Sequence, residues 1–296
     1  MAALQSLRPA VSGVVRNPIL VLVTALYGLF QLPNLLVQSA GPLLASAISL
    51  VTFGVMVLVL PFFQGGLLGM ADEAVAGTTR LGTLVAVGKA NYVPLLLGYF
   101  ALLAVNMVFG FLAFTGAIVV VIGGSIAGMN GGTGGGMGGA GTGVDAPAFG
   151  FDPTLLVVVA VVAVGLVLVY LLITFFLQFY AHAVVLDDTE LVDGFRRSAG
   201  LVRSNFLSVF GYTVVLTIGG VLVGVLAAAG SLVFGPQQPA GSPFAEVVSI
   251  DPTPAIVAAV AIGYVLLTGI AGAFYATYSV AFYREISGGA GGDAPR

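Results

Sequence analysis

The chain has 296 residues, of which 59% are hydrophobic and only 7% are charged, and its net charge is −3. A soluble domain carries roughly 25% charged residues, so this composition excludes a water-soluble globular protein and requires a surface that mostly faces lipid. The acidic balance excludes a strongly basic protein that binds nucleic acid. Because the chain has no cysteine, it has no disulfide framework and no thiolate site.

Six apolar runs reach the roughly 20 residues that a helix needs to cross the bilayer. In chain order they cover residues 18–37, 43–70, 92–126, 154–186, 206–234 and 254–283. None of them alternates with the two-residue period of a barrel strand. The sequence therefore predicts an all-α, polytopic integral membrane protein with six transmembrane helices, folded as a single domain over residues 1–286.

Basic residues fall on one side of this predicted topology. The outer segments 38–42, 127–153 and 235–253 contain no Lys or Arg, and the inner segments contain all nine basic residues of the chain. Because Lys and Arg in short loops stay cytoplasmic, we expect both termini in the cytoplasm and the protein in the plasma membrane. The glycine-rich segment 127–153 is then a flexible extracellular loop, and residues 287–296 are a disordered cytoplasmic tail.

The most charged stretch, DDTELVDGFRRSAGLVRSNF at residues 187–206, has a counterpart earlier in the chain. A shift of 114 residues places Glu73 on Asp187, Lys89 on Arg203 and Asn91 on Asn205. A shorter version, Arg16-Asn17-Pro18, precedes the first apolar run. The pattern predicts an internal repeat in which short cytoplasmic helices precede transmembrane helices 1, 3 and 5.

These short segments combine an apolar stripe at helical spacing with basic residues on other faces, which is typical of helices that lie in the membrane interface. Five basic residues are the candidate contacts to lipid phosphate or to a partner subunit: Arg16, Lys89, Arg196, Arg197 and Arg203. Asparagine is a preferred N-cap, so we expect Asn17, Asn91 and Asn205 to cap the transmembrane helices that follow them.

The acid-rich turn at Asp187 and Asp188, followed by GFRRSAGLVRSNF leading into the fifth run, resembles a known family. It is similar to the membrane-domain group related to glycerophosphoryl diester phosphodiesterases, especially to uncharacterised members in halophilic archaea. The resemblance implies a six-helix membrane fold. The soluble phosphodiesterase domain of some relatives has no counterpart in this sequence, so the resemblance implies no enzymatic activity.

Three functions remain open. The favoured one is a non-enzymatic scaffold or partner subunit, with no catalytic residue, metal or cofactor, which contacts anionic lipid and forms a homo-oligomer or a membrane assembly. The second is a transporter or channel whose uncharged polar path is lined by Gln64, Gln178 and Asn106, although such amides more often hydrogen-bond between helices. The third is a lipid-modifying enzyme that uses His182, the only histidine, with Asp187 and Asp188.

Overall fold

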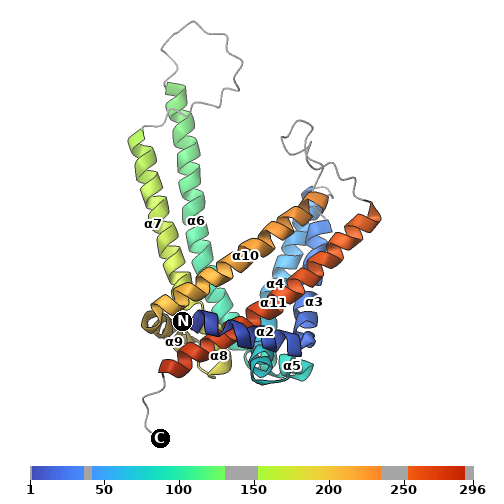
Figure 1. Cartoon of the computed structure of the whole chain (residues 1–296). Coiled ribbons are helices and arrows are strands. Elements are labelled where there is room, and N and C mark those ends of the chain that lie inside the picture. Colours follow the sequence, from blue (N-terminus) through green and yellow to red (C-terminus); the bar gives the residue numbers. More distant parts are fainter. Residues whose placement is uncertain (1, 37–41, 131–152, 235–252, 291–296) are drawn as a thin grey trace. The chain divides into compact units, whose positions relative to one another are not determined.

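A computed structural model describes residues 2–36, 42–130, 153–234 and 253–290, and in these ranges all regular structure is helical (Figure 1). The helices are α1 (Ala2–Gln5), α2 (Leu7–Arg16), α3 (Pro18–Leu36), α4 (Pro42–Ala76), α5 (Leu81–Ala90), α6 (Tyr92–Asn130), α7 (Pro153–Leu177), α8 (Tyr180–Leu186), α9 (Leu191–Ser204), α10 (Phe206–Phe234) and α11 (Pro254–Ala290).

Five helical segments of the described chain are long and apolar enough to cross a membrane. The count rises to six if α1–α2 and the start of α3, which are bent by 87° at Asn17, are taken as one span. Large apolar side chains cover the outer faces of these helices and are exposed on the protein surface. Because that much exposed apolar surface requires lipid as the solvent, the protein is a multi-pass membrane protein.

The chain divides into two compact units, residues 1–99 with 177–296 (unit 1) and residues 100–176 (unit 2). Unit 2 is a hairpin made of most of α6 and most of α7. Within it, the Tyr170 hydroxyl donates a hydrogen bond of 2.7 Å to the side-chain oxygen of Asn106. The Tyr170 ring also lies 5.4 Å from the ring of Phe109. These contacts join the two helices of the hairpin through one polar and one aromatic pair.

The core of unit 1 forms where α11 packs closely against α3. A side-chain carbon at Gly269 would lie 2.8 Å from the Val21 carbonyl oxygen, so only glycine permits this approach. The Thr24 hydroxyl donates to the Gly269 carbonyl at 2.5 Å across the same contact. Close approach through small residues is a common way to pack helices in lipid. Here it places α3, from the N-terminal part of the chain, against α11, from the C-terminal part.

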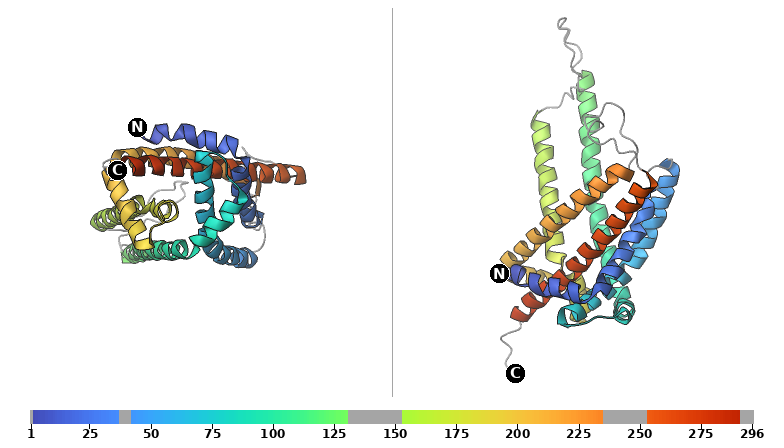
Figure 2. Two further views of the ribbon diagram at one scale, coloured as in Figure 1. Left: turned by 90° about the horizontal axis from the view of Figure 1, so that it is seen from below. Right: turned by 45° about the vertical axis from the view of Figure 1, so that its right-hand side comes forward.

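The N-terminal helices α1 and α2 lie along the C-terminal part of α11 and are bent away from the direction of α3 (Figure 2). The Tyr278 hydroxyl donates to the Ala3 carbonyl at 2.9 Å, and Ser6 donates to the Glu285 carboxylate at 2.9 Å. Gly13 faces the carbonyl of Ala74 at the end of α4. The first segment of the chain therefore connects the ends of α4 and α11.

The other two short helices differ from each other in character. In α9 the buried residues Gly194, Ser198, Leu201 and Val202 recur at helical spacing, and charged residues occupy the other faces. In contrast, α5 is apolar apart from Thr83 and Lys89 and packs closely against α4, where a carbon added at Gly88 would lie 2.7 Å from the Phe62 carbonyl oxygen. α2 and α9 are therefore amphipathic, whereas α5 is mostly apolar.

Helix bounds follow the apolar runs with four main differences. α4 continues beyond the second run, which ends at residue 70, to Ala76. The fourth run is broken at residues 178 and 179, between α7 and α8, where the Phe179 N–H donates to the Ser198 hydroxyl at 3.1 Å. α11 continues to Ala290, so the first part of the predicted disordered tail is helical and residues 291–296 lie outside the described chain. α6 likewise extends to Asn130, and residues 131–152 of the predicted loop lie outside the description.

The two predicted repeat copies share an order of elements but not one register. The starts of α5 and α9 are 110 residues apart, whereas Asn91 and Asn205 at their ends are 114 apart. α9 has 14 residues and α5 has 10, which is about one turn of difference. Glu73 consequently lies inside the last turn of α4, while Asp187 follows α8, so these two acids are not in equivalent places.

Candidate lipid-contact surface and helix-lined cavity

Five exposed cations of unit 1 make no ion pair or hydrogen bond through their side chains within the described chain. We call them the basic collar: Arg8, Arg16, Arg80, Lys89 and Arg203. They belong to α2, to the turn before α5, to α5 and to α9, which gather at one end of unit 1 (Figure 1).

Three collar residues lie in the last turn of a short helix, namely Arg16 in α2, Lys89 in α5 and Arg203 in α9. The C-terminal end of a helix carries partial negative charge, which favours a cation there without a carboxylate partner. The sequence predicted these three as contact residues, and Arg8 and Arg80 join them in the structure.

Arg197, the fourth predicted contact residue, points into an ion-pair cluster. Its Nε lies 2.7 Å from an Asp187 carboxylate oxygen and donates to the Tyr283 hydroxyl at 3.4 Å. The Tyr283 hydroxyl in turn donates to Asp187. Arg197 therefore holds α9 and the turn after α8 against α11, which is a structural role that the short sequence motif did not indicate.

The hydrogen bond to Tyr283 has the largest effect on the pKa of Arg197 in this cluster. The bond to Tyr283, followed by the nearby Asp187 charge, raises the pKa of Arg197 above its ordinary value, although burial acts in the opposite direction. The guanidinium therefore stays charged at every physiological pH. Arg196, the fifth predicted contact, forms a more exposed pair with Asp193 at 3.2 Å, and exposed pairs of this kind are weak.

The asparagines act at the ends of the short helices rather than at the starts of the long ones. Each side-chain amide donates to the carbonyl four residues earlier: Asn17 to Gly13 at 2.9 Å, Asn91 to Val87 at 3.2 Å and Asn205 to Leu201 at 3.2 Å. The last carbonyls of a helix lack partners, and an amide nitrogen supplies the donor they need. The expected N-cap role is thus replaced by a C-terminal one.

Asn17 also makes long-range hydrogen bonds, which Asn91 and Asn205 do not make to any described residue. Its amide nitrogen donates to the Gly77 carbonyl at 3.0 Å, and its oxygen accepts from the Thr79 N–H at 2.9 Å. Glu73, in the last turn of α4, accepts from the hydroxyl of Thr79 in this turn at 2.9 Å and from that of Thr83 in α5 at 2.8 Å. The corner between α2 and α3 is thereby hydrogen-bonded to the turn between α4 and α5.

The three amides predicted to line a polar path lie in different surroundings. Asn106 bonds within unit 2, to the Leu102 carbonyl and to Tyr170. Gln178 accepts from the Thr213 hydroxyl at 3.4 Å. Gln64 lines the cavity described in the next paragraph, and its side chain makes no hydrogen bond within the described residues. Two of the three amides thus serve helix packing.

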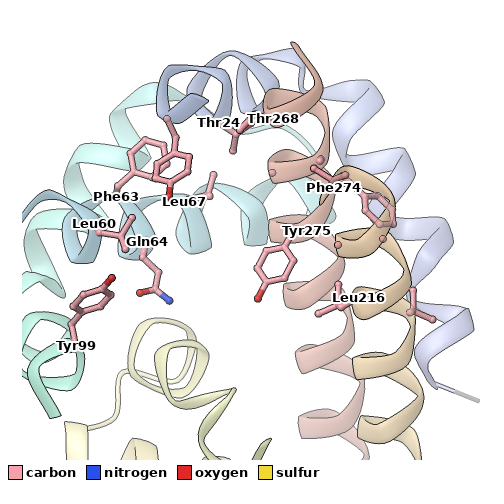
Figure 3. A pocket seen from close by; sticks show the side chains of 17 residues that line it. Thr24, Leu60, Phe63, Gln64, Leu67, Tyr99, Leu216, Thr268, Phe274 and Tyr275 are labelled. Carbon is pink, nitrogen blue, oxygen red and sulfur yellow. The ribbon is translucent and has the colours of Figure 1, made fainter. Parts of the chain in front are cut away.

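That cavity has a volume of about 660 Å³ and lies inside unit 1. Residues of α3, α4, α10 and α11 line it together with Tyr99 at the start of α6. Figure 3 shows Gln64 between Tyr99 and Tyr275, whose oxygen atoms turn towards it from opposite sides. Apolar side chains and two glycines of α10, Gly219 and Gly220, form most of the remaining wall.

A comparison with family models matches residues 1–286 of the chain to a domain of unknown function, DUF7847. The chain belongs to the DUF7847 family. Comparisons with curated proteins and with solved structures find no match. The resemblance to the phosphodiesterase-related membrane group and a halophilic archaeal source both stay predictions for this DUF7847 chain.

His182, the key residue of the enzyme hypothesis, is buried in the DUF7847 fold rather than placed at the interface. Its ring stacks on Tyr283 at 5.4 Å and meets the edge of Phe179 at 5.6 Å, and neither ring nitrogen has a hydrogen-bond partner within the described chain. Asp187 is engaged by Arg197 and Tyr283. The described residues contain no group of three or more His, Cys, Asp or Glu side chains suited to a metal.

Proposed function

We propose that this DUF7847 protein is a non-enzymatic membrane scaffold or partner subunit whose basic collar binds anionic lipid headgroups. The observation that carries the proposal is the set of exposed cations without carboxylate partners on the short helices. A basic residue beside an anionic leaflet contributes about 1 kcal/mol to binding. Together these residues suit a surface that meets phosphate groups.

The amphipathic helix α2 gives this proposal its most specific support. It bends by 87° from α3 and contains Arg8 and Arg16 but no acidic residue. Val11 and Val15 are exposed on the same helix. A helix that exposes apolar side chains beside arginines suits the boundary between acyl chains and headgroups. The collar side would then be the cytoplasmic side.

Three acidic residues at this end are already paired with arginines. Asp72 binds Arg284, Asp187 binds Arg197 and Asp193 binds Arg196. Asp188 and Glu190 are exposed before α9 and reduce the positive charge locally. We therefore expect the strongest lipid contacts at α2 and α5, which carry no acidic residue.

Native mass spectrometry of the protein released from nanodiscs of mixed phosphatidylglycerol and phosphatidylcholine tests the proposal. A variant with Arg8→Gln, Arg16→Gln, Lys89→Gln and Arg203→Gln should bind phosphatidylglycerol more than about tenfold more weakly and retain correspondingly less of it, since each of the four cations contributes about 1 kcal/mol. Asp193→Asn, which releases Arg196, should retain more. Equal retention by wild type and the four-site variant would show that the collar does not bind lipid.

The transporter alternative has less support. Of its three predicted path residues, Gln178 and Asn106 are not among those that line the cavity. The cavity itself is mostly apolar, which does not suit a hydrated solute. Its chemistry favours a different kind of occupant.

A further inference from the structure

We infer that the cavity of unit 1 binds a neutral lipid that has a compact oxygen-bearing head and an apolar tail. The volume of about 660 Å³ lies within the roughly 300 to 1,000 Å³ that is usual for small-molecule sites. It is also several times the roughly 150 Å³ of an engineered cavity that admits benzene. The space is large enough for a head group and part of a chain.

The lining excludes a charged ligand. No Asp, Glu, Lys, Arg or His is among the cavity residues. A charged group placed there would have no countercharge, and burying an unpaired charge carries a large desolvation penalty. Leu60, Phe63, Val223 and Phe274 offer apolar surface instead. The occupant is therefore uncharged and mostly apolar.

Polar groups at one place in the cavity define where the head would bind. Gln64, Tyr99 and Tyr275 come from α4, α6 and α11, and none of the three side chains makes a hydrogen bond within the described chain. In Figure 3 the two tyrosine oxygens face the Gln64 amide. By contrast, the hydroxyls of Thr24 and Thr268 already bond to carbonyls of their own helices.

An unpartnered amide at membrane depth is unfavourable unless a ligand supplies its hydrogen bonds. Glutamine has both a carbonyl acceptor and NH₂ donors, and each tyrosine hydroxyl both donates and accepts. A carbonyl of a quinone ring can accept from the Gln64 NH₂ group or from a tyrosine hydroxyl, and the free hydroxyl of a diacylglycerol can accept from the same donors and also donate to the Gln64 carbonyl oxygen. Both molecules share the required chemistry, a neutral head with an acyl or isoprenoid tail.

The glycines of α10 provide a way to fill the cavity without disturbing its walls. A side-chain carbon added at Gly220 meets no atom within 4 Å, and the same holds for Gly224, which is not among the lining residues. Gly220→Leu therefore occupies ligand space, and Gly224→Leu on the same helix is its matched control.

The test titrates delipidated, detergent-solubilised protein with decylubiquinone, with dioctanoylglycerol and with dioctanoyl-phosphatidylglycerol, and follows binding by native mass spectrometry. We expect at least one of the two neutral probes to bind in a 1:1 ratio, and the stronger of them identifies the head group. Gly220→Leu should lower the affinity for that probe by about tenfold or more. Gln64→Leu should lower it by about tenfold, because the hydrogen bonds to the head group are lost. Gly224→Leu should leave it within about twofold of wild type.

Three outcomes would overturn the inference. The first is that neither neutral probe binds. The second is that the Gly220 and Gly224 substitutions change the affinity equally. The third is that only the anionic probe binds. If circular dichroism shows that Gly220→Leu does not fold, the affinities of Gln64→Leu and wild type for the neutral probe are compared instead, and equal affinities would overturn the inference. The four-site collar variant should bind the neutral probe normally, so failure of this inference is distinguishable from failure of the proposed collar.

Discussion

The side-chain oxygen of Asn17 accepts a hydrogen bond from the main-chain N–H of Thr79 at 2.9 Å, across 62 residues of sequence. The same side chain donates to the Gly77 carbonyl. One amide thus satisfies two main-chain groups of the turn between α4 and α5 and keeps that turn against the α2–α3 corner.

We predict that Asn17→Ala lowers the free energy of unfolding by about 2 to 3 kcal/mol, because it leaves a buried N–H and a carbonyl without partners. The matched control is Asn205→Ala, since within the described ranges the Asn205 side chain bonds only to Leu201 and Ser204 nearby, and we expect this variant to lose at most about 1 kcal/mol. SDS-induced unfolding followed by circular dichroism measures both. Equal losses would mean that the contacts to the turn contribute nothing.

A second long-range contact joins Arg284 of α11 to Asp72 of α4. Two parallel bonds of 2.8 and 2.7 Å connect the guanidinium to the carboxylate. Both side chains are partly exposed, at 46% and 32%, so we expect a coupling energy of about 0.5 to 1 kcal/mol rather than that of a buried pair. A double-mutant cycle with Asp72→Ala and Arg284→Ala checks this.

The pair of Arg196 with Asp193 is the matched control for that cycle. It has a single contact of 3.2 Å, and its side chains are 77% and 62% exposed. Its coupling should be near zero, at most a few tenths of a kcal/mol. A larger coupling for this exposed pair than for Arg284 with Asp72 would contradict the interpretation.

Local sequence patterns predicted the helices well because each apolar run is itself the cause of its helix in lipid. The runs beginning at Pro18, Phe206 and Pro254 start where α3, α10 and α11 start. The short helices that precede α3, α6 and α10 were also expected as helices. Their placement in the membrane interface stays a prediction.

What the sequence could not predict are contacts between distant residues. Asp72 and Arg284 are 212 residues apart, and Asp187 meets Tyr283 across 96. No periodicity signals such pairs, because they depend on which helices become neighbours. The same limit explains why the ion pair of Arg197 with Asp187 was not predicted. It also explains why the cavity around Gln64 was missed, although Gln64 itself was noticed as a polar residue in an apolar run.

The contact between α3 and α11 gives a prediction about a single methyl group. At Gly269 a side-chain carbon would lie 2.8 Å from the Val21 carbonyl oxygen, whereas at Gly263 on the same helix it would meet nothing within 4 Å. Gly269→Ala should therefore destabilise the fold by about 1 to 3 kcal/mol through overpacking.

Gly263→Ala should instead be neutral or stabilising by up to about 1 kcal/mol, because alanine favours a helix over glycine. Thermal unfolding of both variants in the same detergent compares them. An unchanged stability of Gly269→Ala would show that α3 and α11 can separate without loss, and that the unit 1 core lies elsewhere.

The predicted orientation in the membrane can be checked by cysteine labelling, because the natural chain has no cysteine and so gives no background. Thr78 is exposed in the turn between α4 and α5, on the collar end of unit 1, whereas Ser198 is buried against Phe179 and unsuited to labelling. Gly134 belongs to the predicted extracellular loop, outside the described residues.

In intact cells a membrane-impermeant maleimide should label Gly134→Cys alone, and Thr78→Cys should react only after permeabilisation, since the basic segments stay cytoplasmic. Labelling of Thr78→Cys in intact cells would show that the predicted topology is wrong and that the basic collar lies against the outer leaflet.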